Sequence, residues 1–185
     1  MLELGILFID GEFNEELANR FRTQLFTVTR LGITDVTLFI NSYGGSVYDF
    51  LTVYGMIKSF KNLHLTTIVN GYAMSAGAYL ACLGDVRRAT PGSRIMLHEL
   101  SSGSNGKLNE LKVDMNENKE LQEFLTKIVK KVIKNKRFNV NKWLEKDQYM
   151  SVKESYELGL LTHNNFEMEI VQPLDLEIEE EEKGE

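Results

Sequence analysis

The chain has few of the residues that stabilise secreted or membrane proteins. Its 185 residues include one cysteine and two prolines. The single cysteine, Cys82, cannot form a disulfide within the chain, which indicates a reducing, intracellular setting where a buried cysteine behaves as a small hydrophobic residue. No stretch approaches the roughly 20 apolar residues that span a bilayer, and the opening MLELGILFIDGEF has no basic segment or cleavage site. The sequence therefore predicts a cytoplasmic protein with no membrane partner.

Clusters of basic and aromatic residues are also missing, which argues against a nucleic-acid partner. The net charge is −6 at pH 7, and much of the negative charge lies in residues 173–185, PLDLEIEEEEKGE. That composition is typical of a disordered, solvated tail. The chain is 43% hydrophobic and long enough to bury a core. We therefore expect one domain, residues 1–172, followed by the acidic tail.

Apolar stretches alternate with segments of helical periodicity in the first half of the chain. A strand predicted at Gly5–Asp10, with a turn after it at Asp10-Gly11, precedes a helix for which Asn14 is the predicted N-cap. Strands predicted at Val36–Asn41 and Leu65–Val69 each lead through a glycine-containing turn into another helix. Such units predict an α/β fold with a mainly parallel sheet, whose functional residues lie just past the carboxyl ends of the strands.

The second half has one more apolar strand signal and a long amphipathic segment. Arg94–Leu97 predicts a short strand, and Leu108–Lys134 predicts a helix roughly twice the average length. A helix of that length is hard to pack on one small domain and favours a partner subunit, although a broken helix packed within the chain is an alternative. Ser151, with Glu154 three residues later, predicts a capping box that begins a short final helix.

One hydroxyl, that of Ser75, lies among the small and apolar residues of Asn70–Gly84. In a turn between strand and helix, a serine can act as a nucleophile, and the helix N-terminus helps to stabilise nearby negative charge. The same small residues could equally serve close packing of a helix on a sheet, with Ser75 as an incidental N-cap. This stretch alone does not decide between the two interpretations.

Acyl transfer by serine also requires a base, an acid that orients the base, and donors for the oxyanion. His98 follows a predicted strand, where a base could face a neighbouring nucleophile, although a lone histidine there can also be structural. Gly44-Gly45 can present N–H groups to an anion, or can simply form a turn that needs positive φ. Four residues are available as the acid: Asp147, Glu145, Asp85 and Glu99.

Four stretches of the sequence, taken together, indicate a protein family far more specifically than any one of them does. They are FINSYGGSV (Phe39–Val47), GYAMSAGAYL (Gly71–Leu80), ATPGSRIMLHEL (Ala89–Leu100) and KDQYMSVKESYELGLL (Lys146–Leu161). In this order they closely resemble the ClpP family, the proteolytic subunits of the Clp protease, from about Gly5 to Thr162. The resemblance implies a ClpP/crotonase-like spiral of β-β-α units. It also implies a protruding handle at about residues 101–136 that interlocks two stacked heptameric rings into a chamber.

The resemblance also implies a role for each candidate residue. Ser75 matches the family's nucleophile, His98 its general base and Asp147 its triad aspartate. Gly45 and Ala76 match the positions whose backbone N–H groups form the oxyanion hole. The implied activity is that of a serine endopeptidase acting on peptides or unfolded proteins, with no metal or cofactor.

The chain departs from the family pattern in two places. Tyr43 stands where the family commonly has proline before the double glycine. The first predicted strand begins at Gly5, so the family's N-terminal segment, which forms pore loops and helps to engage an ATP-driven unfoldase, has essentially no counterpart here. An unfoldase is therefore the weakest partner expectation, and a short chain would also suit a stand-alone peptidase or a phage-type maturation protease.

Two alternatives belong to other functional classes. An inactive ring subunit or scaffold would keep the architecture, but it would not need the set Ser75, His98 and Asp147. A crotonase-like acyl-CoA enzyme would also use backbone amides as an oxyanion hole, but the sequence has no added segment suited to the nucleotide part of coenzyme A.

Overall fold

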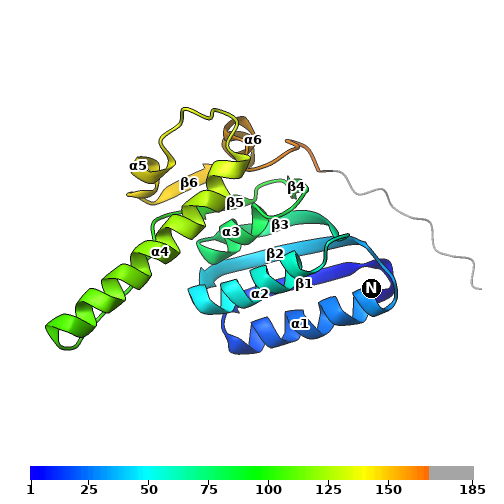
Figure 1. Cartoon of the computed structure of the whole chain (residues 1–185). Helices are drawn as coiled ribbons and strands as arrows, with labels where there is room; N and C mark the ends of the chain where they lie inside the picture. The colour runs from blue at the N-terminus through cyan, green and yellow to red at the C-terminus, as the bar shows by residue number, and fades with distance from the viewer. Residues whose placement is uncertain (167–185) are drawn as a thin grey trace, which may run out of the picture.

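A computed structural model describes residues 1–166, which form a six-stranded sheet with helices packed against it (Figure 1). The strands are β1 (Ile6–Phe13), β2 (Asp35–Gly45), β3 (His64–Met74), β4 (Val86–Ala89), β5 (Arg94–Leu97) and β6 (Gln148–Ser151). The helices are η1 (Leu2–Leu4), α1 (Glu15–Arg30), α2 (Val47–Ser59), α3 (Ala76–Ala81), α4 (Leu108–Val132), α5 (Val140–Leu144) and α6 (Val152–Leu158). The tail predicted at 173–185, and the last residues of the domain predicted at 1–172, lie outside the described residues.

The strand order β1-β2-β3-β5-β6 brings the carboxyl ends of β2, β3 and β5 to one edge of the sheet. All pairs are parallel except β5 with β6, which are antiparallel. Strand β3 is long enough to pair twice: its first half pairs with β4 and its second half, Tyr72–Met74, pairs with Arg94–Met96 of β5. The predicted α/β class with a mainly parallel sheet is confirmed.

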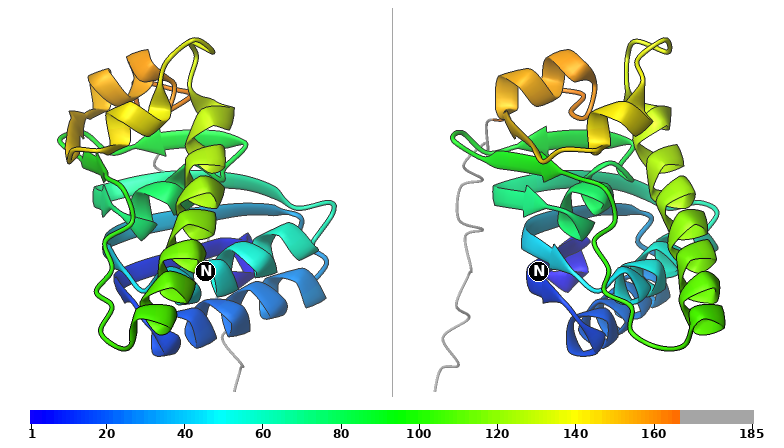
Figure 2. Two further views of the ribbon diagram at one scale, coloured as in Figure 1. Left: turned by 60° about the vertical axis from the view of Figure 1, so that its left-hand side comes forward. Right: turned by 90° about the vertical axis from the view of Figure 1, so that its left-hand side faces the viewer.

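The hydrophobic core lies between one face of this sheet and the helices α1, α2 and α3 (Figure 2), and it extends to the second half of α4. Alternate residues of β2 are buried, among them Leu38 and Ile40, as the two-residue period of a strand requires. On the opposite face the rings of Phe8 and Phe39 stack with centroids 5.4 Å apart and stay half-buried. Parallel sheets are normally covered on both faces, whereas this second face leaves Phe8 and Phe39 partly exposed.

Several local predictions are confirmed and others are wrong. The Asn14 side chain accepts a hydrogen bond from the Leu17 N–H at 2.9 Å, as an N-cap should. The turn predicted at Asp10-Gly11 is not one, because β1 continues through it with a bulge between Asp10 and Glu12. Four short elements, η1, β4, α5 and β6, were not expected, because none of them has an apolar run as distinct as that of the equally short β5.

Helix α4 is one continuous helix, so the alternative of a broken helix is wrong, although part of α4 does pack within the chain. Its second half buries Leu121, Leu125 and Val129 against the rest of the chain. Its first half extends beyond the sheet (Figure 1) and leaves Val113 and Met115 exposed by 67% and 71%. These two apolar side chains of the first half therefore lack a partner in the described part of the chain.

Within residues 1–166, none of the helices has the length and apolar character needed to cross a membrane.

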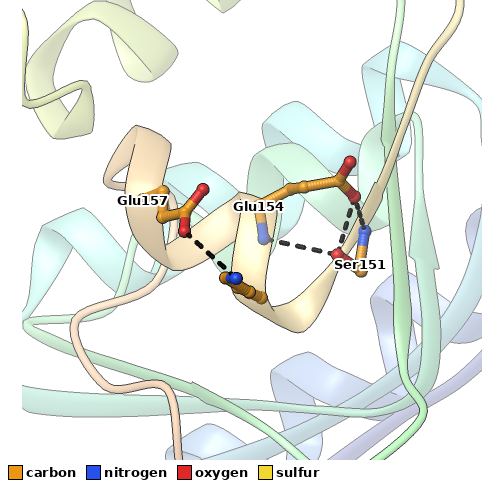
Figure 3. Close-up of polar contacts among 4 residues, drawn as sticks. Ser151, Glu154 and Glu157 are labelled. Atoms are coloured by element: carbon orange, nitrogen blue, oxygen red, sulfur yellow. Dashed lines mark hydrogen bonds and ion pairs between the residues drawn. The ribbon is translucent and has the colours of Figure 1, made fainter.

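The predicted capping box at Ser151 is confirmed (Figure 3). The Ser151 N–H donates to Glu154 Oε2 at 2.8 Å, and the Glu154 N–H donates to Ser151 Oγ at 3.3 Å. The side-chain hydrogen bond from Ser151 is the largest of the effects that lower the pKa of Glu154. The nearby ion pair of Lys153 with Glu157 is exposed and contributes little. The cap fixes where β6 ends and α6 begins.

Arg87 in β4 forms hydrogen bonds that hold residues 159–162 against the sheet. Its guanidinium donates to the carbonyl oxygens of Gly84, Gly159 and Leu160 at 2.9, 3.2 and 2.8 Å. The backbone of Arg87 also exchanges hydrogen bonds with Thr162. Partial burial lowers the pKa of Arg87 from its ordinary value, but an arginine remains charged at neutral pH.

We predict that Arg87→Met lowers the free energy of unfolding by about 2–4 kcal/mol, because hydrogen bonds from a charged group contribute about 1.5–3 kcal/mol each and solvent reduces the total here. Denaturant unfolding measures the change. Arg88→Met, at the next position of β4, is the matched control and should cost less than about 1 kcal/mol. Equal losses in the two variants would contradict the role of Arg87.

Candidate functional site

Ser75 occupies the turn between β3 and α3. Its φ of 49° makes it the one non-glycine residue with positive φ in residues 1–166, and its ψ is −121°. Such a conformation costs about 1–3 kcal/mol and persists only where the surrounding structure imposes it. Here the Ser75 N–H donates to the Met96 carbonyl of β5 at 2.9 Å. A serine on a strained strand-to-helix turn is typical of nucleophiles in acyl-transfer enzymes.

The double glycine at the end of β2 lies directly against the Ser75 turn. A Cβ atom added to Gly44 would lie 2.6 Å from Ser75 Cβ and 3.0 Å from the Ala76 nitrogen. Gly44 and Gly45 have φ values of 99° and 138°, which also favour glycine. The buried Ser42 hydroxyl accepts the Gly44 N–H at 3.0 Å and holds the turn. Both glycines therefore serve positive φ, and Gly44 also allows the close approach to Ser75, whereas Gly45 lies against Glu12 and Phe13 of β1.

His98 follows β5 directly and lines the same cavity as Ser75. This cavity has a volume of about 220 Å³, and Gly45 and Ala76 also line it. Ala76 is the first residue of α3, so its N–H has no acceptor within the helix. The rest of the lining is largely apolar and includes Val47, Phe50, Leu100 and Leu125. Four of the five predicted site residues thus lie around one cavity.

Asp147 lies in an adjoining cavity of about 380 Å³ that His98 also lines. Glu99 and Glu145 line this second cavity too. Asp85 does not: its carboxylate accepts the Leu65 N–H at 2.9 Å near the amino end of β3. Three of the four candidate acids therefore remain near His98. Within residues 1–166, Ser75, His98 and Asp147 make no side-chain hydrogen bonds to one another in this structure.

Tyr79 is a site residue that the sequence reasoning missed. It lines the cavity with Ser75 and His98, and its hydroxyl donates to the His98 carbonyl oxygen at 2.7 Å. Burial raises the pKa of this phenol well above its ordinary value. The available signal was its spacing, because the fourth residue after Ser75 lies one helical turn along α3.

The Cys82 thiol and possible metal ligands are the two other kinds of reactive group to consider. Burial raises the pKa of the Cys82 thiol to about 12, so this cysteine stays protonated and unreactive at neutral pH. In the part of the chain that the structure describes, no group of three or more histidine, cysteine or acidic side chains is placed to hold a metal ion.

A comparison with protein families agrees with the resemblance seen in the sequence. The model of the family described as Clp protease matches residues 1–164. The chain belongs to the Clp protease family. Clp proteases are peptidases, and they generally form oligomeric rings that act on peptide or protein substrates. The matched range of this Clp protease contains Gly45, Ser75, Ala76, His98 and Asp147.

For this Clp protease we predict that Gly44→Ala is more destabilising than Gly11→Ala, although the two glycines have similar φ values of 99° and 97°. A Cβ at Gly11 meets nothing within 4 Å, so only the backbone cost of about 1–2 kcal/mol applies. A Cβ at Gly44 clashes with the Ser75 turn and should cost a further 1–3 kcal/mol or so. Denaturant unfolding of the two variants tests this, and equal costs would show that Gly44 does not sit tightly against Ser75.

Proposed function

We propose that the chain is a serine endopeptidase that cleaves peptides or unfolded proteins through an acyl-enzyme. The observation that carries the proposal is the cavity where the strained Ser75 turn, His98 and the Gly45 and Ala76 backbone meet. The adjoining cavity, which contains Asp147 and shares His98, supports an orienting role for this carboxylate. Membership of a peptidase family supports the choice of the peptide bond as the target.

The first half of the proposed reaction forms an acyl-enzyme. His98 takes the hydroxyl proton of Ser75 as Oγ attacks the carbonyl carbon of the substrate. The N–H groups of Gly45 and Ala76 stabilise the oxyanion of the tetrahedral intermediate. His98 then protonates the leaving amine, the C–N bond breaks, and the acyl group stays on Ser75. Asp147 holds the imidazole in the required tautomer and stabilises its protonated form.

The second half of the proposed reaction releases the product. His98 takes a proton from water, whose oxygen attacks the acyl carbon and forms a second oxyanion in the same site. Collapse of this intermediate breaks the ester bond, returns the proton to Ser75 and frees the new carboxylate. Every proton moves between His98, Ser75, water and substrate, so the reaction as proposed requires no metal or cofactor.

The proposed setting is a chamber of stacked heptameric rings. Two uncovered apolar surfaces support assembly: the exposed first half of α4, with Val113 and Met115, and the sheet face with Phe8 and Phe39. An α4 that interlocks with its counterpart in another ring would bury the first surface. Contact with a neighbour within the ring would cover the second. Enclosing the site in a chamber would restrict the substrates to peptides and unfolded chains.

We predict that the purified oligomer cleaves a small fluorogenic peptide and that Ser75→Ala abolishes at least 99.9% or so of kcat, since removal of a triad nucleophile leaves only residual catalysis. Ser46→Ala, at another serine of the cavity wall, is the matched control and should retain activity within a few fold. Cleavage that persists in Ser75→Ala would sink the mechanism. A wild-type oligomer that cleaves no peptide would favour an inactive ring subunit.

The three neighbouring carboxylates give a second test of the mechanism. Asp147→Asn should lower kcat about 10³–10⁴-fold, because an amide cannot hold the imidazole in the required tautomer. Glu145→Gln and Glu99→Gln are isosteric controls in the same cavity and should lower kcat less than tenfold or so. The assignment of Asp147 fails if one of the glutamate variants shows the larger loss.

A further inference from the structure

The phenol of Tyr79 connects the two halves of the candidate site. Tyr79 lies in α3, where its backbone N–H donates to the Ser75 carbonyl at 3.0 Å. Its side-chain hydroxyl donates to the His98 carbonyl at 2.7 Å. One residue therefore links the backbone of the proposed nucleophile with the backbone of the proposed base.

The surroundings of Tyr79 keep this link in one geometry. The residue is 2% exposed, and its ring packs near Phe50 with centroids 6.3 Å apart. Burial is the main reason that the pKa of the phenol is raised, with a smaller contribution from the Cys82 thiol. The hydroxyl therefore remains a protonated donor. Loss of this donor would leave a partly buried carbonyl without the hydrogen bond from Tyr79, which costs free energy.

His98 lies where the regular strand pairing has ended. Upstream, the Ser75 N–H bonds to Met96 of β5. Downstream, the Glu99 N–H donates to Leu144 of α5 at 2.8 Å, and the Leu100 N–H donates to Gln122 of α4 at 2.6 Å. Between these points, the orientation of the His98 carbonyl sets the ψ angle of His98. This carbonyl shares one planar peptide unit with the Glu99 N–H, so the Tyr79 hydroxyl and Leu144 hold opposite sides of the unit and together fix its orientation.

We propose that Tyr79 is a positioning residue: its hydroxyl holds the His98 backbone so that the imidazole faces Ser75 across the cavity. The catalytic consequence rests on the proposed function, whereas the effect on the geometry of His98 does not. Since the hydroxyl is bonded to a backbone oxygen, Tyr79 acts through His98 and not on the substrate. Its loss should slow the chemical step and leave substrate binding largely unchanged.

Tyr79→Phe tests this against the matched control Tyr54→Phe. Both tyrosine rings pack near Phe50, with centroid distances of 6.3 and 6.2 Å, and only the Tyr79 hydroxyl bonds to His98 among the described residues. For Tyr79→Phe we expect kcat for a fluorogenic peptide to fall about 10- to 100-fold with KM within twofold, as a small misplacement of a catalytic group would cause. Tyr54→Phe should keep both constants within twofold of the wild type.

A second variant and a second readout keep the test valid. Replacing Tyr79 by 4-aminophenylalanine restores a donor at the ring's para position and should recover most of the lost kcat. NMR of protein with ¹³C-labelled histidine imidazoles reports on His98 directly, with His98→Gln used to assign its signal. We expect Tyr79→Phe to shift the His98 signal, whereas the signals of His64 and His163 stay in place. Thermal unfolding of each variant shows that the fold is retained.

The outcomes separate this inference from the proposed function. Tyr79→Phe with wild-type kcat and an unchanged His98 signal would overturn the positioning role. A loss of kcat that is equal in Tyr79→Phe and Tyr54→Phe, with no shift of His98, would overturn it as well. If the wild type cleaves no peptide but Tyr79→Phe still shifts the His98 signal, the positioning role stands and the proposed peptidase activity fails.

Discussion

The close contact between Gly44 and the Ser75 turn is the constraint on which the rest of the site depends. Ser75 holds a backbone conformation that costs free energy, and its N–H bond to β5 helps to impose that conformation. The turn can lie against β2 only because Gly44 has no side chain, as the 2.6 Å clash of an added Cβ shows. The strained serine and Gly44 are therefore one structural unit contributed by two strands.

The topology of the sheet brings the remaining groups to this unit. Parallel strands have their carboxyl ends at the same edge of the sheet. The residues at the ends of β2, β3 and β5, namely Gly45, Ser75 and His98, therefore line one cavity. The antiparallel pairing of β6 with β5 then places Asp147, just before β6, on the adjoining cavity. Four segments far apart in the sequence meet within a chain that buries them against one core. The surfaces that stay uncovered, on α4 and on the outer sheet face, are where the proposed ring contacts would form.

The sequence was a good guide wherever a pattern was long or chemically distinct. The hydrophobic strands before each glycine turn, the Asn14 cap and the Ser151 capping box could all be predicted, because each rests on a local rule. The short strands β4 and β6 could not, since their pairing depends on partners distant in the sequence. Composition could not place the acids near His98 either, and only the fold shows that Asp85 lies elsewhere. The spacing of Tyr79 from Ser75 indicates that the two residues lie on one side of a helix, but only the fold shows the hydrogen bond from Tyr79 to the His98 backbone.

The proposed function rests on one serine, Ser75. The most direct measurement is mass-spectrometric peptide mapping after the oligomer has reacted with a fluorophosphonate, which phosphonylates only an activated serine. The account predicts a single adduct on Ser75, and no adduct when the protein is denatured before the reagent is added, because the reactivity comes from the folded site and not from the residue alone. An adduct on another serine, or the same labelling of Ser75 in the denatured chain, would contradict it.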